Sequence, residues 1–173
     1  MCIMPARASS ISLQQAKSDP VNQVAPLLTA DRIFLDAHID SKRQLFDWLG
    51  TMAAQEAGLD AAQVSASLLS REKLGSTALG RQVAIPHGRI KGLKTALGML
   101  VRLTSPIGFD APDALPVGLV FVLLVPAQAT DLHLQILGEL AQVLGDADLR
   151  QKMIRASDAQ QVMQMLTDWQ PWG

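Results

Sequence analysis

The sequence predicts an α/β fold, a three-layer sandwich in which helices cover both faces of a mixed, mostly parallel sheet. Helical patterns occupy both ends of the chain and strand patterns occupy the middle. One strand pattern, residues 117–125, is apolar at every position but Gly118, which is typical of a strand covered on both faces. Hydrophobic residues make up 49% of the 173 residues and charged residues 18%. Such a chain can bury a sizeable core as one domain, which we place at residues 21–173.

The start of the chain carries little periodic signal. Residues 1–20 are polar, small and aperiodic, so we expect a flexible N-terminal extension there. Residues 21–28 predict a short helix, and residues 33–35 predict a short strand that Asp36 ends.

Two helices follow, each with a recognisable beginning and end. Ser41 is a suitable N-cap, because its hydroxyl can accept a hydrogen bond from an amide in the first turn. Apolar residues then recur at helical spacing as far as Gly58. Asp60 caps the second helix, and Gly75 is its expected C-terminal stop.

The middle of the chain predicts a sheet. Residues 75–80 are too short and too rich in glycine to form a helix. Pro86 is expected to end the first strand of this region, because proline donates no hydrogen bond to a sheet. Residues 105–116 hold three prolines and predict an irregular connection. Three segments predict strands: residues 83–85, 96–103 and 117–125.

The C-terminal part predicts three helices. Thr130 or Asp131 caps a long helix that runs to about residue 144. Asp146 starts the next helix, and Asp158 starts the last, which ends near Trp169. Five residues of the long helix are expected to face the core: Leu134, Leu137, Leu140, Ala141 and Leu144.

Composition excludes several classes of function. A formal net charge of -1 without a basic run gives no electrostatic case for nucleic acid. The single cysteine, Cys2, allows no disulfide within the chain, which fits a reducing compartment. The longest apolar run, residues 117–125, is shorter than the roughly 18 residues of a membrane helix. With no signal-like pattern at the start, we expect a cytoplasmic protein without membrane insertion.

His87 lies in the most polar cluster of the sequence. It directly follows a predicted strand, and strand ends in open α/β sheets are common ligand sites. Pro86 restricts the residue before it to an extended conformation. Gly88 lets a partner or a phosphate approach the backbone, and Arg89 can neutralise an anion near the ring. The alternative is a surface-loop histidine whose ring is satisfied by the backbone.

His133 and His38 differ in their surroundings. His133 falls in the first turn of the long C-terminal helix, where free N–H groups favour anions, so it can donate to a phosphate on His87. Its register with the apolar positions leaves a second interpretation, a residue at the edge of the core. His38 has apolar residues directly on both sides, Ala37 and Ile39, and is interpreted as an exposed loop residue.

Arg71 lies in the last turns of its helix. A cation there complements the helix dipole, or its guanidinium reaches across the glycine loop to bind phosphoryl oxygens in a fork. The loop lacks the ending of a P-loop, but Ser76 and Thr77 can donate to a phosphate. Three scattered histidines and one cysteine give no metal-ligand spacing. We therefore expect no metal.

Several motifs together resemble the signature of the fructose/mannitol/nitrogen enzyme IIA family of the bacterial phosphotransferase system. The match covers roughly residues 21–169, and it is specific only in combination. Its segments are REKLGSTALG at 71–80, VAIPHGR at 83–89, PIGFD at 106–110, PV at 116–117, LLVP at 123–126 and HL at 133–134. One departure is Ala78, where many members have glycine.

The resemblance implies roles for three residues. His87 matches the phosphorylated histidine, His133 the second active-site histidine, and Arg71 the phosphate-binding arginine. The string of residues 71–77 looks most like the nitrogen-regulatory members. Those members receive a phosphoryl group from an HPr-like carrier and act on regulatory targets such as kinases or transporters. The implied chemistry is that of a phosphotransferase component with a phosphohistidine intermediate, without a metal or an organic cofactor.

Three functions stay open from the sequence. The first is a regulatory phosphocarrier, the second a sugar-specific enzyme IIA, and the third a non-phosphorylated binding module of the same fold. In the first two, one ring nitrogen of His87 should donate to a backbone carbonyl or side chain, which fixes the tautomer. A carrier-docking patch could come from Ala78, Leu79 and Ile90, although Leu79 and Ile90 could instead be core residues.

Overall fold

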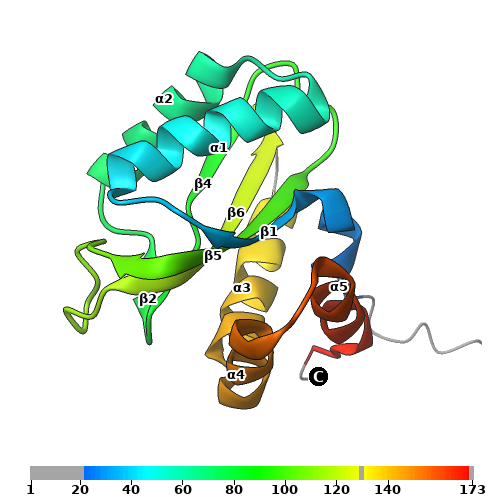
Figure 1. Cartoon of the computed structure of the whole chain (residues 1–173). Helices are drawn as coiled ribbons and strands as arrows, with labels where there is room; N and C mark the ends of the chain where they lie inside the picture. Colours follow the sequence, from blue (N-terminus) through cyan, green and yellow to red (C-terminus); the bar gives the residue numbers. More distant parts are fainter. Residues whose placement is uncertain (1–21, 129–130, 172–173) are drawn as a thin grey trace, which may run out of the picture.

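The computed structural model describes residues 22–128 and 131–171. The extension expected at residues 1–20 and the alternative cap Thr130 lie outside these residues. The described part forms a mixed sheet between two layers of helices, so the expected α/β sandwich is confirmed (Figure 1).

The sheet runs in the order β1-β5-β6-β3-β2, and β4 also pairs with β6. Strand β6 pairs in parallel with β3 and β4 and antiparallel with β5, while β1 pairs in parallel with β5 and β2 antiparallel with β3. The six strands are β1 Ile33–Ala37, β2 Ala78–Gly80, β3 Val83–Ala84, β4 His87–Ile90, β5 Leu97–Ile107 and β6 Val117–Pro126.

Helices cover both faces of this sheet (Figure 1). One face carries α1 (Lys42–Ala57) and α2 (Ala61–Lys73). The other face carries α3 (Leu132–Gly145), α4 (Ala147–Arg155) and α5 (Ala159–Asp168). Two 3-10 turns, η1 (Ala25–Leu27) and η2 (Ala30–Arg32), precede β1.

The apolar run of β6 separates two hydrophobic clusters. Alternate side chains of a strand point to opposite faces of a sheet. Val120, Val122 and Leu124 belong to the cluster under α1 and α2. Phe121 and Leu123 belong to the cluster under α3, α4 and α5. Both faces of this strand are therefore buried, as its composition predicts.

The predicted helix caps are confirmed at four positions. Each side chain accepts a hydrogen bond from the amide three residues along, and the four caps are Ser41, Asp60, Asp146 and Asp158. Gly58 ends α1 in the left-handed conformation with φ 67°. Asp131 is the N-cap of α3 but makes no side-chain capping bond.

Several local predictions are wrong. Residues 21–28 contain only the 3-10 turn η1 among the described positions. Strand β5 continues to Ile107, so the first part of segment 105–116 is regular. It does so because Pro106 lies where the β5–β6 register shifts and few ladder amides are needed. Strands β2 and β4 were not expected.

The inward face of α3 also differs from the prediction. Leu140 and Leu144 are buried as expected, together with Ile136 and Val143. Leu134 is 59% exposed, Ala141 is exposed and Leu137 is half-buried. The helix is rotated so that these three residues lie on the stripe beside the buried one, which leaves an apolar strip available to the site.

Candidate functional site

His87 follows the end of β3, as expected, and it is also the first residue of a further short strand, β4. Strands β3 and β4 both pair in parallel with β6, and only Ile85 and Pro86 interrupt them. The Pro86 carbonyl still accepts from the Leu123 amide at 3.0 Å. His87 therefore lies directly after a short interruption between β3 and β4, and pairing with β6 holds the backbone before and after this interruption.

Both ring nitrogens of His87 have defined partners. Nδ1 lies 2.9 Å from the carbonyl oxygen of Ile85, which can only accept, so Nδ1 carries the proton. Nε2 is then the nitrogen with a free lone pair, and it accepts from Nε of Arg71 at 3.2 Å. The backbone contact fixes the neutral tautomer and points Nε2 toward Arg71.

Arg71 extends from the last turn of α2 toward the histidine. Its Nη1 donates to the carbonyl of Gly75 at 2.9 Å while its Nε donates to His87. The two contacts use only part of the five-donor guanidinium fork, so the group has further N–H donors for an anion.

The pKa of His87 is lowered from its ordinary value. Burial is the largest cause, because the charged imidazolium loses hydration. The hydrogen bond to Ile85 raises this pKa, electrostatic interactions with Arg71 and His133 lower it further, and the charge of Glu72 raises it. The ring is therefore held in its neutral, nucleophilic form near pH 7.

A surface hollow of about 210 Å³ lies around His87. Residues of α2, the following loop, β2, the β3–β4 break and α3 line it: Arg71, Ser76, Thr77, Ala78, Leu79, Ile85, His87, Leu137 and Ala141. Leu79 is 45% exposed, which suits a docking patch, and Ala78 is buried. Ile90 is buried in the core under α1 and α2, so it does not belong to a surface patch.

His133 lies in the first turn of α3 and is half-buried. It lines a second hollow, of about 750 Å³, together with Lys94, Val125 and Ile136. Val125 pairs with Arg89, which lies two residues after His87 in β4. The structure thus brings His133 near the site without placing it in the same hollow.

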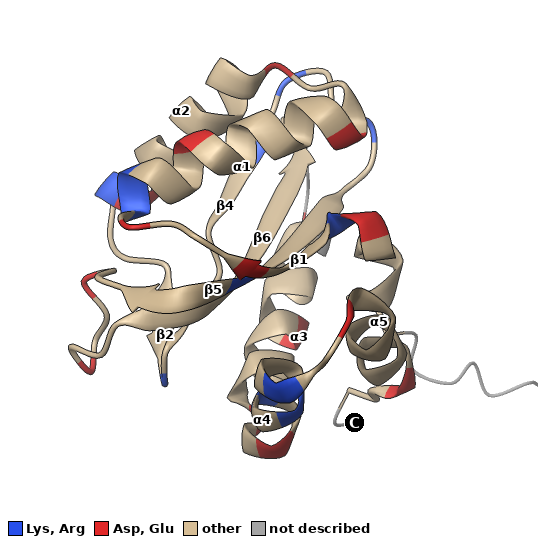
Figure 2. Cartoon of the chain, in the orientation of Figure 1, with Lys and Arg blue, Asp and Glu red and all other residues tan. Residues whose placement is uncertain are grey.

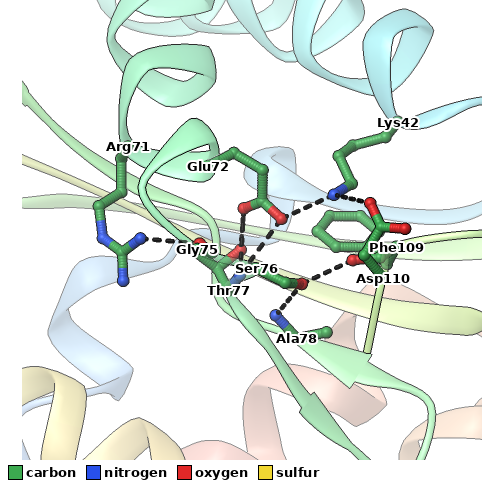
Figure 3. Close-up of polar contacts among 9 residues, drawn as sticks. All are labelled: Lys42, Arg71, Glu72, Gly75, Ser76, Thr77, Ala78, Phe109 and Asp110. Atoms are coloured by element: carbon green, nitrogen blue, oxygen red, sulfur yellow. Dashed lines mark hydrogen bonds and ion pairs between the residues drawn. The ribbon is translucent and has the colours of Figure 1, made fainter. Parts of the chain in front are cut away.

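The hydroxyls of Ser76 and Thr77 are engaged within the protein (Figure 3). Ser76 Oγ donates to the carbonyl of Phe109 at 2.6 Å and accepts from the amide of Ala78. Thr77 Oγ1 donates to Glu72 at 2.6 Å. Both residues therefore organise the loop beside His87 through their hydroxyls.

Gly88 and Arg89 lie on opposite faces of β4. Gly88 faces α2, and a Cβ there would lie 2.3 Å from Ser67 Oγ. The missing side chain thus admits the helix. Arg89 is exposed on the same face as His87, and it donates to the carbonyl of Ala127 at 3.3 Å.

Sequence reasoning missed Glu72 and Lys42. Glu72 is buried in the last turn of α2, and Lys42 is the first residue of α1. A signal for Glu72 exists in the sequence, because a carboxylate in the last turn of a helix opposes the helix dipole. An unfavourable charge at such a position indicates a specific partner elsewhere in the fold.

Other classes of site find no support in the described part of the chain. No group of three or more His, Cys, Asp or Glu side chains there could hold a metal ion. None of its helices has the length and apolar character needed to cross a bilayer. Figure 2 shows acidic and basic residues interspersed over these helices and turns in the view drawn. His38 is exposed in a loop, as expected.

Comparison with known proteins identifies the class that this fold and site define. Residues 26–169 match the family model described as "Phosphoenolpyruvate-dependent sugar phosphotransferase system, EIIA 2". The match covers most of the chain, so the chain belongs to this family of phosphotransferase enzyme IIA domains, and the resemblance noted in its motifs is confirmed.

Within the family, the similar proteins include a sugar-specific EIIA component and several nitrogen regulatory proteins. The one from Pseudomonas aeruginosa is 37% identical over 145 residues, 83% of this chain and 94% of the relative. The one from Escherichia coli is 35% identical over 152 residues, 87% and 93% of the two chains. The crystal structure of nitrogen regulatory protein IIA-Ntr from Neisseria meningitidis superimposes with a TM-score of 0.79 at 44% identity, covering 83% of this chain and 99% of that one. These similarities support a phosphocarrier role of the enzyme IIA kind.

Proposed function

We propose that the chain accepts a phosphoryl group on Nε2 of His87 from an HPr-like carrier and signals through partners that bind according to its phosphorylation state. The observation that carries this proposal is the fixed tautomer of His87. The Ile85 carbonyl holds the proton on Nδ1, and Nε2 faces Arg71 inside an open hollow. A neutral imidazole with one oriented lone pair is a competent nucleophile for phosphoryl transfer.

The transfer step follows from these contacts. The Nε2 lone pair attacks the phosphorus held on the carrier's histidine, so one N–P bond forms as the carrier's N–P bond breaks. The electron pair of the broken bond returns to the carrier's ring nitrogen. The His87 ring gains positive charge in this step, and the Ile85 carbonyl stabilises it through Nδ1–H.

Arg71 changes partner during the transfer. Its Nε–H points at the lone pair that must attack, so it moves from Nε2 to the oxygens of the arriving phosphoryl group. Charge on the equatorial oxygens is the main feature that protein groups stabilise in such reactions. His133 assists as a second donor from the start of α3, and Arg89 provides positive charge on the same face.

Three exposed leucines supply the surface on which a carrier docks. Leu74 follows α2 and is 84% exposed, Leu79 lies in β2, and Leu134 lies in α3. These elements border the His87 hollow, and apolar side chains of this kind form the core of protein interfaces. Phosphorylation places nearly two negative charges at the centre of this surface. A partner that binds the unphosphorylated surface would have to desolvate that charge, which is costly, so it should bind the phosphorylated form much more weakly.

The test is incubation with the general phosphotransferase proteins and phosphoenolpyruvate, followed by intact-mass measurement. We expect one added phosphoryl group that is labile to acid and stable to alkali. His87→Ala should abolish the label, whereas His38→Ala, a matched change at an exposed histidine, should keep the wild-type rate. Arg71→Ala and His133→Ala should each slow transfer by about a hundredfold. Full labelling of the His87→Ala variant would exclude this acceptor.

The competing function is that of a sugar-transport enzyme IIA, the activity in the family's own description. A pull-down from lysate with phosphorylated and unphosphorylated protein separates the two. A regulatory protein should recover different partners in the two states. Equal recovery of the same proteins would favour the sugar-transport function. A wild-type chain that accepts no phosphoryl group would point to a binding module that kept only the fold.

A further inference from the structure

Glu72 is a buried carboxylate beside the candidate site, and the transfer chemistry does not use it directly. Its residue is 9% exposed at the end of α2, next to Arg71. Both carboxylate oxygens lie 3.2 Å from the amide nitrogen of Thr77, and one accepts from Thr77 Oγ1 at 2.6 Å. Glu72 therefore holds the backbone and the side chain of Thr77 together (Figure 3).

Lys42 neutralises this carboxylate from another element. Its Nζ lies 2.9 Å from Glu72 and 3.4 Å from Asp110, and it lies 4.7 Å from the centre of the Phe109 ring. A buried carboxylate is tolerated only when it is paired and hydrogen-bonded. The ion pair thus fixes the start of α1, the end of α2 and the segment after β5 to one another.

The loop between α2 and β2 is held at its β2 end by these contacts. Glu72 anchors Thr77, and Ser76 Oγ donates to the carbonyl of Phe109. Gly75 lies between these anchors and the helix, with φ 153°, a conformation that favours glycine. Its carbonyl accepts from Nη1 of Arg71. The position of the Arg71 guanidinium therefore depends on a loop that Glu72 fixes.

We propose that Glu72, paired with Lys42, is a positioning residue for phosphoryl transfer and acts through Arg71. The inference rests on the proposed function, because it assigns Glu72 to the same reaction. Without Glu72 the loop loses its anchor at Thr77, and the Gly75 carbonyl no longer holds the guanidinium beside His87, where it would meet the oxygens of the arriving phosphoryl group. A substitution at Glu72 can misplace Arg71 and so slow the reaction, although Glu72 itself does not touch the phosphoryl group.

Positioning and bare charge predict opposite results for Glu72. As a negative charge, Glu72 repels an arriving phosphoryl group, so removing the charge would speed transfer. As a positioning residue, Glu72 must keep all of its contacts with Thr77 and Lys42 to hold the loop, so Glu72→Gln should slow transfer. Glutamine keeps one oxygen for Lys42, but its NH2 would take the place of the second oxygen, which accepts from the Thr77 amide, a group that only donates.

The experiment is a double-mutant cycle with the full chain, after the wild type has been shown to be labelled on His87. Glu72→Gln should lower the rate at saturating carrier by roughly tenfold. The carrier concentration for half-maximal rate should stay unchanged, because Glu72 lies beneath the surface. The double variant Arg71→Ala/Glu72→Gln should be as fast as Arg71→Ala alone, since the two changes remove the same contribution.

The control is Glu56→Gln, the same chemical change at an exposed position of α1, which should keep the wild-type rate. The 15N chemical shift of His87 Nε2 provides a second measurement, since it should move in the same direction in Glu72→Gln and in Arg71→Ala. If Glu72→Gln does not fold, Lys42→Met is judged by the same criteria. A folded variant with the wild-type rate, or a double variant whose loss is the product of the single losses, would overturn the proposal. An unlabelled wild type would instead refute the proposed function.

Discussion

Replacing Gly88 by alanine tests why the site histidine is followed by glycine. The Cβ of an alanine at this position would lie 2.3 Å from Ser67 Oγ and 3.2 Å from Ser67 Cβ. Ser67 belongs to α2, the helix that carries Arg71, and Gly88 belongs to β4, the strand that carries His87. The substitution therefore pushes apart the two elements whose approach brings Arg71 to His87.

The expected loss in the free energy of unfolding follows from these distances. Ordinary contact begins near 3.4 Å, so the hydroxyl must retreat by 1.1 Å, the difference between 3.4 and 2.3 Å. Rotating it away breaks the 2.9 Å bond from Ser67 Oγ to the carbonyl of Arg89, at about 1 kcal/mol. The 3.2 Å contact with Ser67 Cβ remains, and overpacking of this kind costs about 1–3 kcal/mol. Gly88→Ala should thus lower the free energy of unfolding by about 2–4 kcal/mol.

Urea unfolding of four proteins measures this effect: wild type, Gly88→Ala, Ser67→Ala and the double variant. Removing the hydroxyl leaves only the 3.2 Å contact, so the cost of Gly88→Ala should fall to about 1 kcal/mol in the Ser67→Ala background. Phosphoryl transfer should be slowed in Gly88→Ala and largely restored in the double variant. A cost below about 0.5 kcal/mol, or an equal cost in both backgrounds, would refute the packing role of Gly88.

Two further predictions concern protonation and a helix end. Because burial and Arg71 lower the pKa of His87, the folded protein binds fewer protons than the unfolded chain below about pH 6.5. Stability should therefore fall as the pH drops from 6.5 toward the pKa of His87 in the folded protein. Urea unfolding of His87→Gln should not show this pH-dependent loss of stability. The same pH profile for the variant and the wild type would contradict the prediction. Arg102 donates to three carbonyls at the end of α4, those of residues 153, 154 and 156, and pairs with Asp36. Arg102→Met should cost about 2–3 kcal/mol in the same assay while leaving phosphoryl transfer unchanged, and a slower transfer would show that this contact also serves the site.

The parts of the fold that could be predicted are those encoded by neighbouring residues. A cap at Ser41 or Asp60 needs only its own side chain and the amide three residues along. The double burial of β6 is visible because both faces of the strand are apolar in one short run. Local signals of this kind are satisfied within a few residues, so the folded chain has little freedom to alter them.

The parts that could not be predicted depend on partners far away in the sequence. Strand β4 is only four residues long and is a strand because it pairs with β6, more than thirty residues later. The rotation of α3 is set by the cluster it covers, and several of its faces are apolar, so periodicity alone chose Leu134 and Ala141 wrongly. Tertiary packing decides between such alternatives.

The site shows the same division, and it explains why a motif match found His87 and Arg71 while missing Glu72. The motif preserves residue types along the chain, but each of these side chains is oriented by a backbone carbonyl, of Ile85 for the histidine and of Gly75 for the arginine. A carbonyl carries no sequence information, so its direction must come from what holds the backbone. For His87 that is the pairing of β4 with β6, and for Arg71 it is the loop that Glu72 anchors through Thr77. Under the proposed function, the reactivity of the histidine therefore depends on residues such as Glu72 that bind the backbone and neighbouring side chains and do not touch the phosphoryl group.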